Sequence, residues 1–274
     1  MKIINLSDQN SIINRYLAEM RDKEYQKNRL LFRNNIKRIG EYEAFEISKT
    51  LDYKPENVTT PLGVARVNLP TDDIVIGTIF RAGLPFHEGF LNIFDHSGNA
   101  FVSAFREYTD KNHTEVGIHI EYLATLEIDD KTLIIADPML ATGGSMELGL
   151  KAILTKGSPK HIHVACVLAT PEGIEHIKNT FPDDKTTIWC AAIDEGLNEH
   201  KYIVPGFGDA GDLCYGGKLQ KSESSHCVSI KRKYFRLPMQ VSAFLPLGKL
   251  SFTSKRSQRR ALLASAQAFG QLYP

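Results

Sequence analysis

A carboxylate and a loop of small residues lie close together within residues 131–150. An apolar run ends at Asp137, and the loop ATGGS at residues 141–145 opens a segment with helical periodicity. We therefore expect a buried strand, a loop and a helix. The glycines allow backbone N–H groups to converge on one point, and the helix N-terminus adds free donors. Because Asp137 could also accept hydrogen bonds from sugar hydroxyls, the pattern predicts a site for a phosphorylated sugar.

Two arginines follow other strand-like runs. Arg81 comes directly after the apolar run at residues 73–80 and begins the sequence RAGL. Open α/β sheets bind ligands at the carboxyl ends of their strands, so Arg81 is a candidate for binding pyrophosphate. Arg106 lies near the end of a further run at residues 98–107, and the polar stretch that follows it has the character of a mobile lid.

A glycine-rich segment at residues 198–212 contains the sequence YIVPGFGDAGD. Three glycines and a proline in ten residues are incompatible with a regular helix or strand. Such a segment presents backbone N–H and C=O groups at close range. A planar base with alternating donors and acceptors could be recognised in this way.

Two of these segments resemble those of a known family. DPMLATGGS at residues 137–145 resembles the phosphoribosyl-pyrophosphate loop of type I phosphoribosyltransferases, and its Asp-Pro pair looks like the uracil phosphoribosyltransferase branch. YIVPGFGDAGD is similar to the uracil-binding segment of that branch. The resemblance covers about residues 20–217. It implies transfer of a phosphoribosyl group from 5-phosphoribosyl 1-pyrophosphate to uracil, giving UMP and pyrophosphate in pyrimidine salvage, with magnesium bound together with the phosphoribosyl pyrophosphate.

The resemblance also implies catalytic residues. Arg81 and Arg106 would hold pyrophosphate, and Asp137 would orient the ribose hydroxyls. The remaining contacts to phosphoribosyl pyrophosphate are implied for Pro138, Met139, Leu140, Ala141, Thr142, Gly143, Gly144 and Ser145.

Contacts to uracil are implied for the backbone of Ile203, Gly208 and Ala210, with Asp209 beside them on the phosphoribosyl-pyrophosphate side. A purine or orotate transferase is an alternative that would keep the phosphate loop but should have a different base segment. Competition among bases would separate these possibilities.

Alternating strand and helix patterns follow the phosphate loop. Apolar runs at residues 161–170 and 186–194 flank a helical segment from Pro171 to about Phe181. This alternation implies right-handed crossovers and a doubly wound parallel sheet of the type I phosphoribosyltransferase kind. N-terminal helices are predicted at residues 7–20 and 22–51, where Gly40 leaves room for a break.

The composition excludes several classes of protein. Hydrophobic residues make up 42% and charged residues 24% of the chain, and no apolar run approaches the roughly 20 residues of a membrane span. The first residues, MKIINLSDQN, lack the apolar core of a secretory signal, so we expect a cytoplasmic protein with no membrane partner. The four cysteines form no C-x-x-C pair. His161 and His163 share a strand face without a third ligand nearby in sequence, and we expect no protein-bound metal.

The charge balance changes near residue 221. Residues 222–274 hold nine Lys and Arg against the single acid Glu223, whereas the first 221 residues hold 24 basic and 31 acidic groups. We expect a phosphoribosyltransferase domain at residues 1–221 and a basic extension at 222–274 that is disordered or non-catalytic. A functional basic module that attracts nucleic acid or an acidic membrane surface stays open as the alternative for this extension.

A different class of function also remains open at this point. The same fold could serve a regulator that senses uracil or a nucleotide and binds RNA through the basic extension. The acidic character of the first 221 residues disfavours a nucleic-acid surface elsewhere. For the enzyme, the resemblance implies a homo-oligomer, either a dimer or a higher assembly.

Overall fold

The structure, a computed structural model, describes residues 1–108 and 116–217, and of residues 104–108 and 116–120 it describes the backbone alone. The described residues belong to one unit that spans Met1–Leu219. The predicted basic extension at residues 222–274 lies outside the described residues and stays a prediction.

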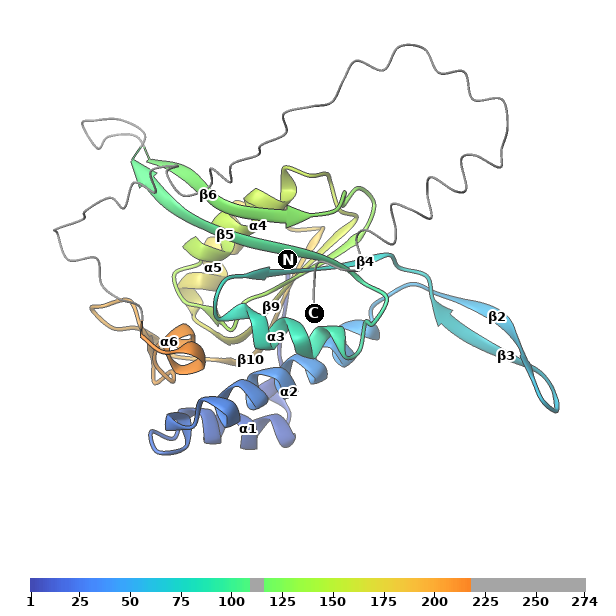
Figure 1. The fold of residues 1–274 in the computed structure, drawn as a ribbon, viewed down its shortest axis with the longest axis horizontal. Helices are drawn as coiled ribbons and strands as arrows, with labels where there is room; N and C mark the ends of the chain where they lie inside the picture. The colour runs from blue at the N-terminus through green and yellow to red at the C-terminus, as the bar shows by residue number, and fades with distance from the viewer. Residues whose placement is uncertain (109–115, 218–274) are drawn as a thin grey trace, which may run out of the picture. The chain divides into compact units, whose positions relative to one another are not determined.

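A mostly parallel sheet forms the centre of the fold (Figure 1). Its strand order is β1-β10-β9-β7-β4-β5-β6, with the short β8 paired to β9, and β6 alone runs antiparallel to its neighbour. The strands are β1 (Lys2–Asn5), β4 (Ile74–Ile79), β5 (Gly98–Tyr108), β6 (Val116–Thr125), β7 (Thr132–Ala136), β8 (Met139–Leu140), β9 (His161–Ala169) and β10 (Thr186–Ile193). The predicted doubly wound parallel sheet is confirmed.

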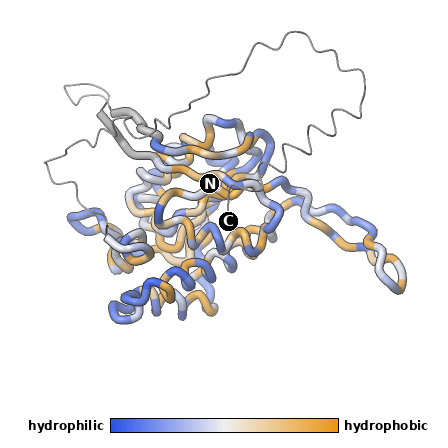
Figure 2. Tube along the Cα trace, viewed as in Figure 1, coloured by the Kyte–Doolittle hydropathy of each residue, from blue (hydrophilic) through white to orange (hydrophobic). Residues whose placement is uncertain are grey.

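Two apolar cores cover the two faces of this sheet. Because successive side chains of a strand point to opposite faces, Ile134 of β7 joins one core and Ile135 the other. Hydrophobic residues accordingly concentrate on the central strands (Figure 2). Continuous apolar runs such as those of β7 and β9 are therefore what a sheet buried on both faces requires.

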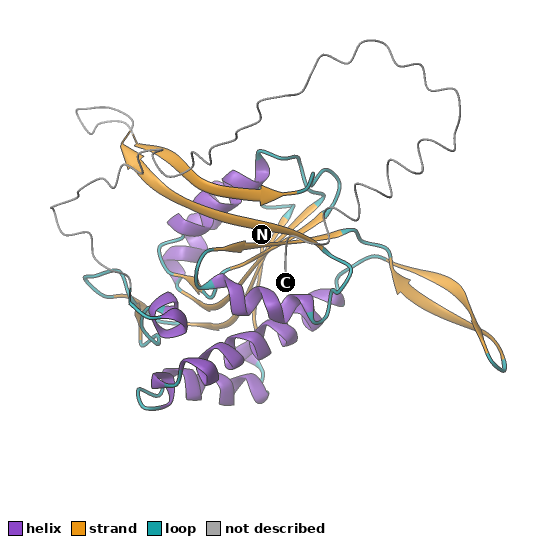
Figure 3. Cartoon of the chain, viewed as in Figure 1, coloured by secondary structure: helices purple, strands orange, loops and turns teal. Residues whose placement is uncertain are grey.

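The helices divide between these two faces (Figure 3). The first face carries α1 (Ile12–Arg21), α2 (Arg29–Ser48), α3 (Gly83–Leu91) and α6 (Ala210–Tyr215), and the second carries α4 (Gly144–Leu154) and α5 (Pro171–Thr180). None of the helices in the described part of the chain combines the length and the hydropathy needed to cross a membrane.

Within the second predicted helical segment, residues 22–51, α2 runs from Arg29 to Ser48 without a break, so the break for which Gly40 left room does not occur. Gly40 serves a close approach between two helices instead. A Cβ atom there would lie 2.7 Å from the carbonyl oxygen of Phe86 on α3, and a Cβ atom at Gly89 would overlap the carbonyl oxygen of Lys37. The two glycines let the backbones of α2 and α3 meet.

Several short elements were not predicted from the sequence. The first strand, β1, pairs in parallel with β10, and a two-stranded hairpin of β2 (Tyr53–Thr60) and β3 (Gly63–Pro70) extends away from the sheet (Figure 1). The remaining small elements are η1 (Leu6–Asp8), η2 (Tyr25–Lys27), β11 (Gly196–Leu197) and β12 (Ile203–Val204).

A buried acid, Glu43, lies on the core-facing side of α2. Its side chain has no exposed surface, and neither carboxyl oxygen has a hydrogen-bond partner among the described residues. Burial raises the pKa of Glu43 well above its ordinary value, because nothing replaces the hydration of the charged form. The core therefore favours the neutral acid.

Replacing Glu43 with Gln should remove a pH dependence of stability. Because its folded pKa is raised, the stabilisation linked to this proton is complete below the unfolded pKa near 4.5 and is lost as the pH rises through the folded pKa. Within that window the group should lower the free energy of unfolding by about 1.4 kcal/mol per pH unit. Urea unfolding of the native protein and E43Q between about pH 5 and pH 8 measures the slope. Glu46→Gln, on the same helix, is the control, and equal slopes for E43Q and the native protein would contradict the expectation.

Candidate active site

A cleft of about 220 Å³ lies at the carboxyl-terminal edge of the sheet. β4 and β7 end beside each other there, since Thr78 pairs in parallel register with Ala136. The loops after these strands meet the segment that leads into α6. The lining residues are Ile79, Phe80, Arg81, Ala82, Asp137, Met139, Ala141, Ser145, Asp209, Ala210 and Gly211. The three segments that the sequence singled out therefore share one cleft.

Asp137 directly follows β7 and is only 8% exposed. The pKa of Asp137 is raised to about 7, mainly by burial; a hydrogen bond from the Met139 backbone N–H lowers the pKa, and the negative charge of Asp209 adds to the increase. The carboxyl group is thus held between its two protonation states near neutral pH. A strongly shifted acid in a cleft is typical of a functional site.

The loop before α4 turns at Gly143, which has a φ of +83°. A Cβ atom there would lie 2.7 Å from the ring of His176 on α5, so the position favours glycine on both counts. The Thr170 hydroxyl, at the end of β9, donates to the Ala141 carbonyl oxygen at 2.7 Å and holds the loop. Ser145 then faces the cleft in the first turn of α4, where backbone N–H groups lack helical partners. This arrangement suits an anion.

The Arg81 guanidinium joins the loop after β4 to the end of the glycine-rich segment. Its Nη2 donates to the Asp212 carboxylate at 2.9 Å, and its Nη1 donates to the Gly216 carbonyl oxygen at 3.3 Å. The Nε atom is buried and has no hydrogen-bond partner within the described residues. One donor of this cation is therefore unsatisfied in the wall of the cleft.

The glycine-rich segment forms the opposite side of the cleft. The Asp209 carboxylate accepts the Asp212 backbone N–H at 2.8 Å and caps α6, while Asp209 and Ala210 both line the cleft. Ile203 is buried in β12, and Gly208 has a left-handed φ of +97°. The segment is therefore a structured turn held at its end by a helix cap.

Not every predicted site residue lines this cleft. Pro138, for example, faces the sheet, and its carbonyl oxygen accepts the backbone N–H groups of Val167 and Leu168. The other predicted residues outside the lining are Leu140, Thr142, Gly143, Gly144, Ile203 and Gly208. The backbone of Arg106 lies in β5 opposite Ile118, but its side chain lies outside the described residues.

Three residues that hold the segments around the cleft, Thr170, Asp194 and Asp212, were not identified from the sequence. Thr170 and Asp194 each follow a parallel strand directly, as Asp137 does, and Asp212 lies in the glycine-rich segment itself. Thr170 holds the phosphate loop and Asp212 holds Arg81. The place directly after a strand, which made Asp137 a candidate, would have identified Thr170 and Asp194 as well.

The histidine pair lies at the other end of the sheet. His161 and His163 are at the start of β9 with ring centroids 4.6 Å apart, and the Trp189 indole N–H donates to His163 Nδ1 at 3.0 Å. Burial, together with the charge of His161, lowers the pKa of His163 to about 3. Across residues 1–108 and 116–217, no group of three His, Cys, Asp or Glu side chains is placed to hold a metal ion.

The chain is similar to several known proteins. A family model described as uracil phosphoribosyltransferase matches residues 7–217. A uracil phosphoribosyltransferase of Porphyromonas gingivalis is 56% identical over 219 residues, which cover 80% of this chain and all of that protein. One from Thermococcus gammatolerans is 39% identical over 206 residues, covering 74% of this chain and 89% of that protein. The solved structure of the AQ2163 protein from Aquifex aeolicus has 30% identity and a TM-score of 0.68, covering 80% of this chain and all of that one.

The variant Asp137→Asn should gain stability relative to the native protein as the pH rises. Because the folded pKa is raised to about 7, the stabilisation linked to the proton is complete below the unfolded pKa near 3.8 and is lost as the pH rises through 7. The variant's advantage in the free energy of unfolding should therefore grow by about 2–3 kcal/mol between pH 5 and pH 8. Chemical denaturation measures it, with the exposed Asp95→Asn as control. A difference that does not vary with pH would overturn this account.

Proposed function

The chain belongs to the uracil phosphoribosyltransferase family, and on that premise we propose which residues carry out each part of the reaction. The protein transfers the phosphoribosyl group of 5-phosphoribosyl 1-pyrophosphate to uracil, giving UMP and pyrophosphate in pyrimidine salvage. One observation carries the residue assignment. Asp137, Arg81 and the N-terminal turn of α4 share a cleft with the glycine-rich segment.

The phosphate loop binds the phosphoribosyl part of the substrate in this proposal. The 5′-phosphate accepts hydrogen bonds from the backbone N–H groups of the first turn of α4 and from Ser145. Residues 138–144 shape the loop that presents these donors. Asp137 accepts hydrogen bonds from the ribose hydroxyls, which favour its charged form and bring its raised pKa down on binding.

Arg81 and Arg106 stabilise the departing pyrophosphate. Loss of this group leaves positive charge on the ribose and negative charge on the leaving oxygens, so preorganised cations lower the barrier. The unpaired Nε of Arg81 supports this role, because a buried donor gains from an anionic partner. Asp212 keeps the same guanidinium in place through its 2.9 Å contact.

Magnesium is proposed to enter with phosphoribosyl pyrophosphate. This ion is usually held by one or two carboxylates together with substrate phosphates. The cleft fits that requirement, because Asp137 and Asp209 both line it and the charge of Asp209 raises the pKa of Asp137. When bound, the ion supplies positive charge that offsets the charge of the pyrophosphate.

Uracil is proposed to bind against the glycine-rich segment. Backbone groups of Ile203, Gly208 and Ala210 read its edge, and Asp209 lies between the base and the phosphoribosyl group. Ala210 and Asp209 already line the cleft, which supports this placement. Reaction then depends on holding the base nitrogen in line with the ribose C1.

Base discrimination tests this assignment. At N3 and C4 uracil presents a donor and an acceptor, whereas cytosine presents an acceptor and a donor, which leaves buried backbone groups unpaired. Incubation with phosphoribosyl pyrophosphate and magnesium should therefore convert uracil to UMP with a kcat/KM on the order of 10⁴ above that for cytosine. Asp137→Asn should reduce UMP formation on the order of 10²–10³. Comparable use of cytosine or hypoxanthine would refute the assignment of the base segment.

The chain is also proposed to form a homo-oligomer through the β2–β3 hairpin. A lone two-stranded hairpin is marginally stable in water. This one is exposed at every residue except Ala65, which is partly buried, and it carries apolar residues on both strands, with Leu62 fully exposed at its turn (Figure 2). A second copy of the chain would cover these side chains.

The double variant Leu62→Asp/Val64→Asp should lower the molar mass of the protein in solution. Charges placed on the hairpin would cost free energy in a buried contact between copies. Size-exclusion chromatography with light scattering measures the change, and Ile93→Asp is the control because Ile93 is also an exposed apolar residue. A native monomer, or an unchanged mass for the double variant, would exclude the hairpin as the contact.

Residues 222–274 are proposed to lie outside the catalytic domain. The charge balance changes there, the family model matches residues 7–217, and the Porphyromonas gingivalis relative is matched over its whole length by 80% of this chain. A chain truncated after Gln220 should keep its melting temperature and its UMP turnover. Unfolding or inactivity of the truncated chain would place the boundary elsewhere.

We propose a cytoplasmic location for this reaction. The three cysteines within the described residues, Cys166, Cys190 and Cys214, are all buried and free, which suits a reducing compartment. Cell fractionation followed by a UMP assay tests it, and activity confined to a membrane or secreted fraction would oppose it.

A further inference from the structure

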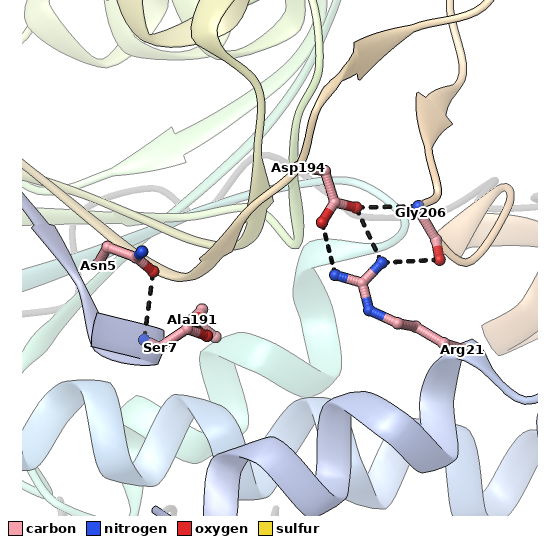
Figure 4. A network of polar contacts seen from close by, with 6 residues as sticks. All are labelled: Asn5, Ser7, Arg21, Ala191, Asp194 and Gly206. Atoms are coloured by element: carbon pink, nitrogen blue, oxygen red, sulfur yellow. Dashed lines mark hydrogen bonds and ion pairs between the residues drawn. The ribbon is translucent and has the colours of Figure 1, made fainter. Parts of the chain in front are cut away.

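An ion pair lies behind the proposed uracil segment, outside the cleft. Asp194 directly follows β10 and is 7% exposed, and Arg21 is the last residue of α1. The two side chains form a bidentate pair, with Nη2 to Oδ1 at 2.6 Å and Nη1 to Oδ2 at 2.9 Å (Figure 4). Bidentate geometry fixes orientation as well as distance.

The same pair binds both peptide groups of one glycine. The Gly206 backbone N–H donates to Asp194 Oδ2 at 2.9 Å, and Arg21 Nη1 donates to the Gly206 carbonyl oxygen at 3.1 Å (Figure 4). Gly206 has a left-handed φ of +56°, and a Cβ atom there would overlap the carbonyl oxygen of Ile203. The ion pair therefore fixes a tight turn whose shape only glycine tolerates.

This turn lies between the residues proposed to read the base. Gly206 stands three residues after Ile203 and two before Gly208. Rotation of the Gly206 peptide would move the backbone groups on both sides of it. Through Gly206, Arg21 and Asp194 thus set the relative positions of the backbone groups of Ile203 and Gly208, which they do not contact.

The N-terminal segment brings Arg21 to this place. β1 pairs with β10 in parallel register, from Lys2 opposite Thr187 to Asn5 opposite Cys190. The Ser7 hydroxyl then donates to the Ala191 carbonyl oxygen at 2.5 Å. The first residues are therefore aligned on the strand that ends at Asp194, and α1 returns to that strand end with Arg21.

We propose that Arg21 and Asp194 are positioning residues for uracil, acting through the peptide groups of Gly206. This inference rests on the proposed binding of uracil by residues 203–210. Loss of the pair should raise the KM for uracil about 10–100-fold, because small displacements of a binding group are costly. The KM for phosphoribosyl pyrophosphate should change less than threefold, since the phosphate loop is held separately by Thr170.

Steady-state kinetics of four variants test the proposal. Arg21→Lys keeps the charge but has no planar fork to bind Asp194 and Gly206 together. Arg21→Ala removes the side chain, and Asp194→Asn keeps its shape without the charge. Arg15→Ala is the matched control, because Arg15 is also an α1 arginine in an ion pair, with Glu19, but its side chain is 73% exposed. It should leave both KM values unchanged.

Chemical rescue separates positioning from a general loss of structure. Methylguanidinium at tens of millimolar should restore the uracil KM of Arg21→Ala several-fold and should not affect Arg15→Ala. If Arg21→Ala does not fold, Arg21→Lys and Asp194→Asn still give the KM comparison. Folded variants with an unchanged uracil KM, or parallel increases in both KM values, would overturn the proposal.

A variant within the segment distinguishes the two possible failures. Gly208→Ala strains a backbone with φ of +97° and should raise the uracil KM if this segment binds the base. An effect of Gly208→Ala without an effect of the Arg21 variants would refute the positioning role alone. No effect of Gly208→Ala in an active enzyme would refute the base assignment on which that role rests.

Discussion

Parallel strand pairing is the constraint on which the site depends. Strands that run in one direction release all their following loops at one edge of the sheet. Asp137 and Arg81 follow neighbouring strands and so meet without being close in sequence. Asp194 follows β10, which lies two strands beyond β7 along the same sheet, and its carboxylate accepts the Gly206 backbone N–H. The site is therefore assembled from strand ends, and each loop has only to present a few groups.

Glu43 and Asp137 are both carboxyl groups whose pKa is strongly raised by burial, but they lie in different surroundings. Glu43 is enclosed in the core with no partner among the described residues, whereas Asp137 opens onto the cleft and accepts one backbone hydrogen bond. The pKa of each is raised by desolvation. Only Asp137 is placed to offset the cost of its desolvated charge by hydrogen bonding to a ligand. A polar ligand would therefore gain affinity from a carboxylate whose charged form destabilises the unliganded protein.

Local sequence patterns predicted much of the fold and part of the site. The strand, loop and helix around Asp137 were evident because apolar runs, glycines and helix periodicity act over a few residues. The pairing of β1 with β10 was not evident from the sequence, because it joins positions 185 residues apart, such as Lys2 and Thr187. The contact between Arg21 and Asp194 was missed for the same reason. The role of Gly40 was not predicted, because a glycine within a helix can mark a break or a close approach, and only the neighbouring helix shows which.

The pairing of β1 has a consequence for the order of folding. During synthesis the first strand leaves the ribosome before its partner, and β10 ends only at Ile193. Until then β1 has no strand to pair with, and Arg21 at the end of α1 has no Asp194 carboxylate to bind. Contacts of such long sequence separation form slowly because they close a long loop. The turn at Gly206 therefore completes its supports only after nearly the whole domain has been made, and a nascent chain contains the loop at residues 141–145 well before this turn is held in place.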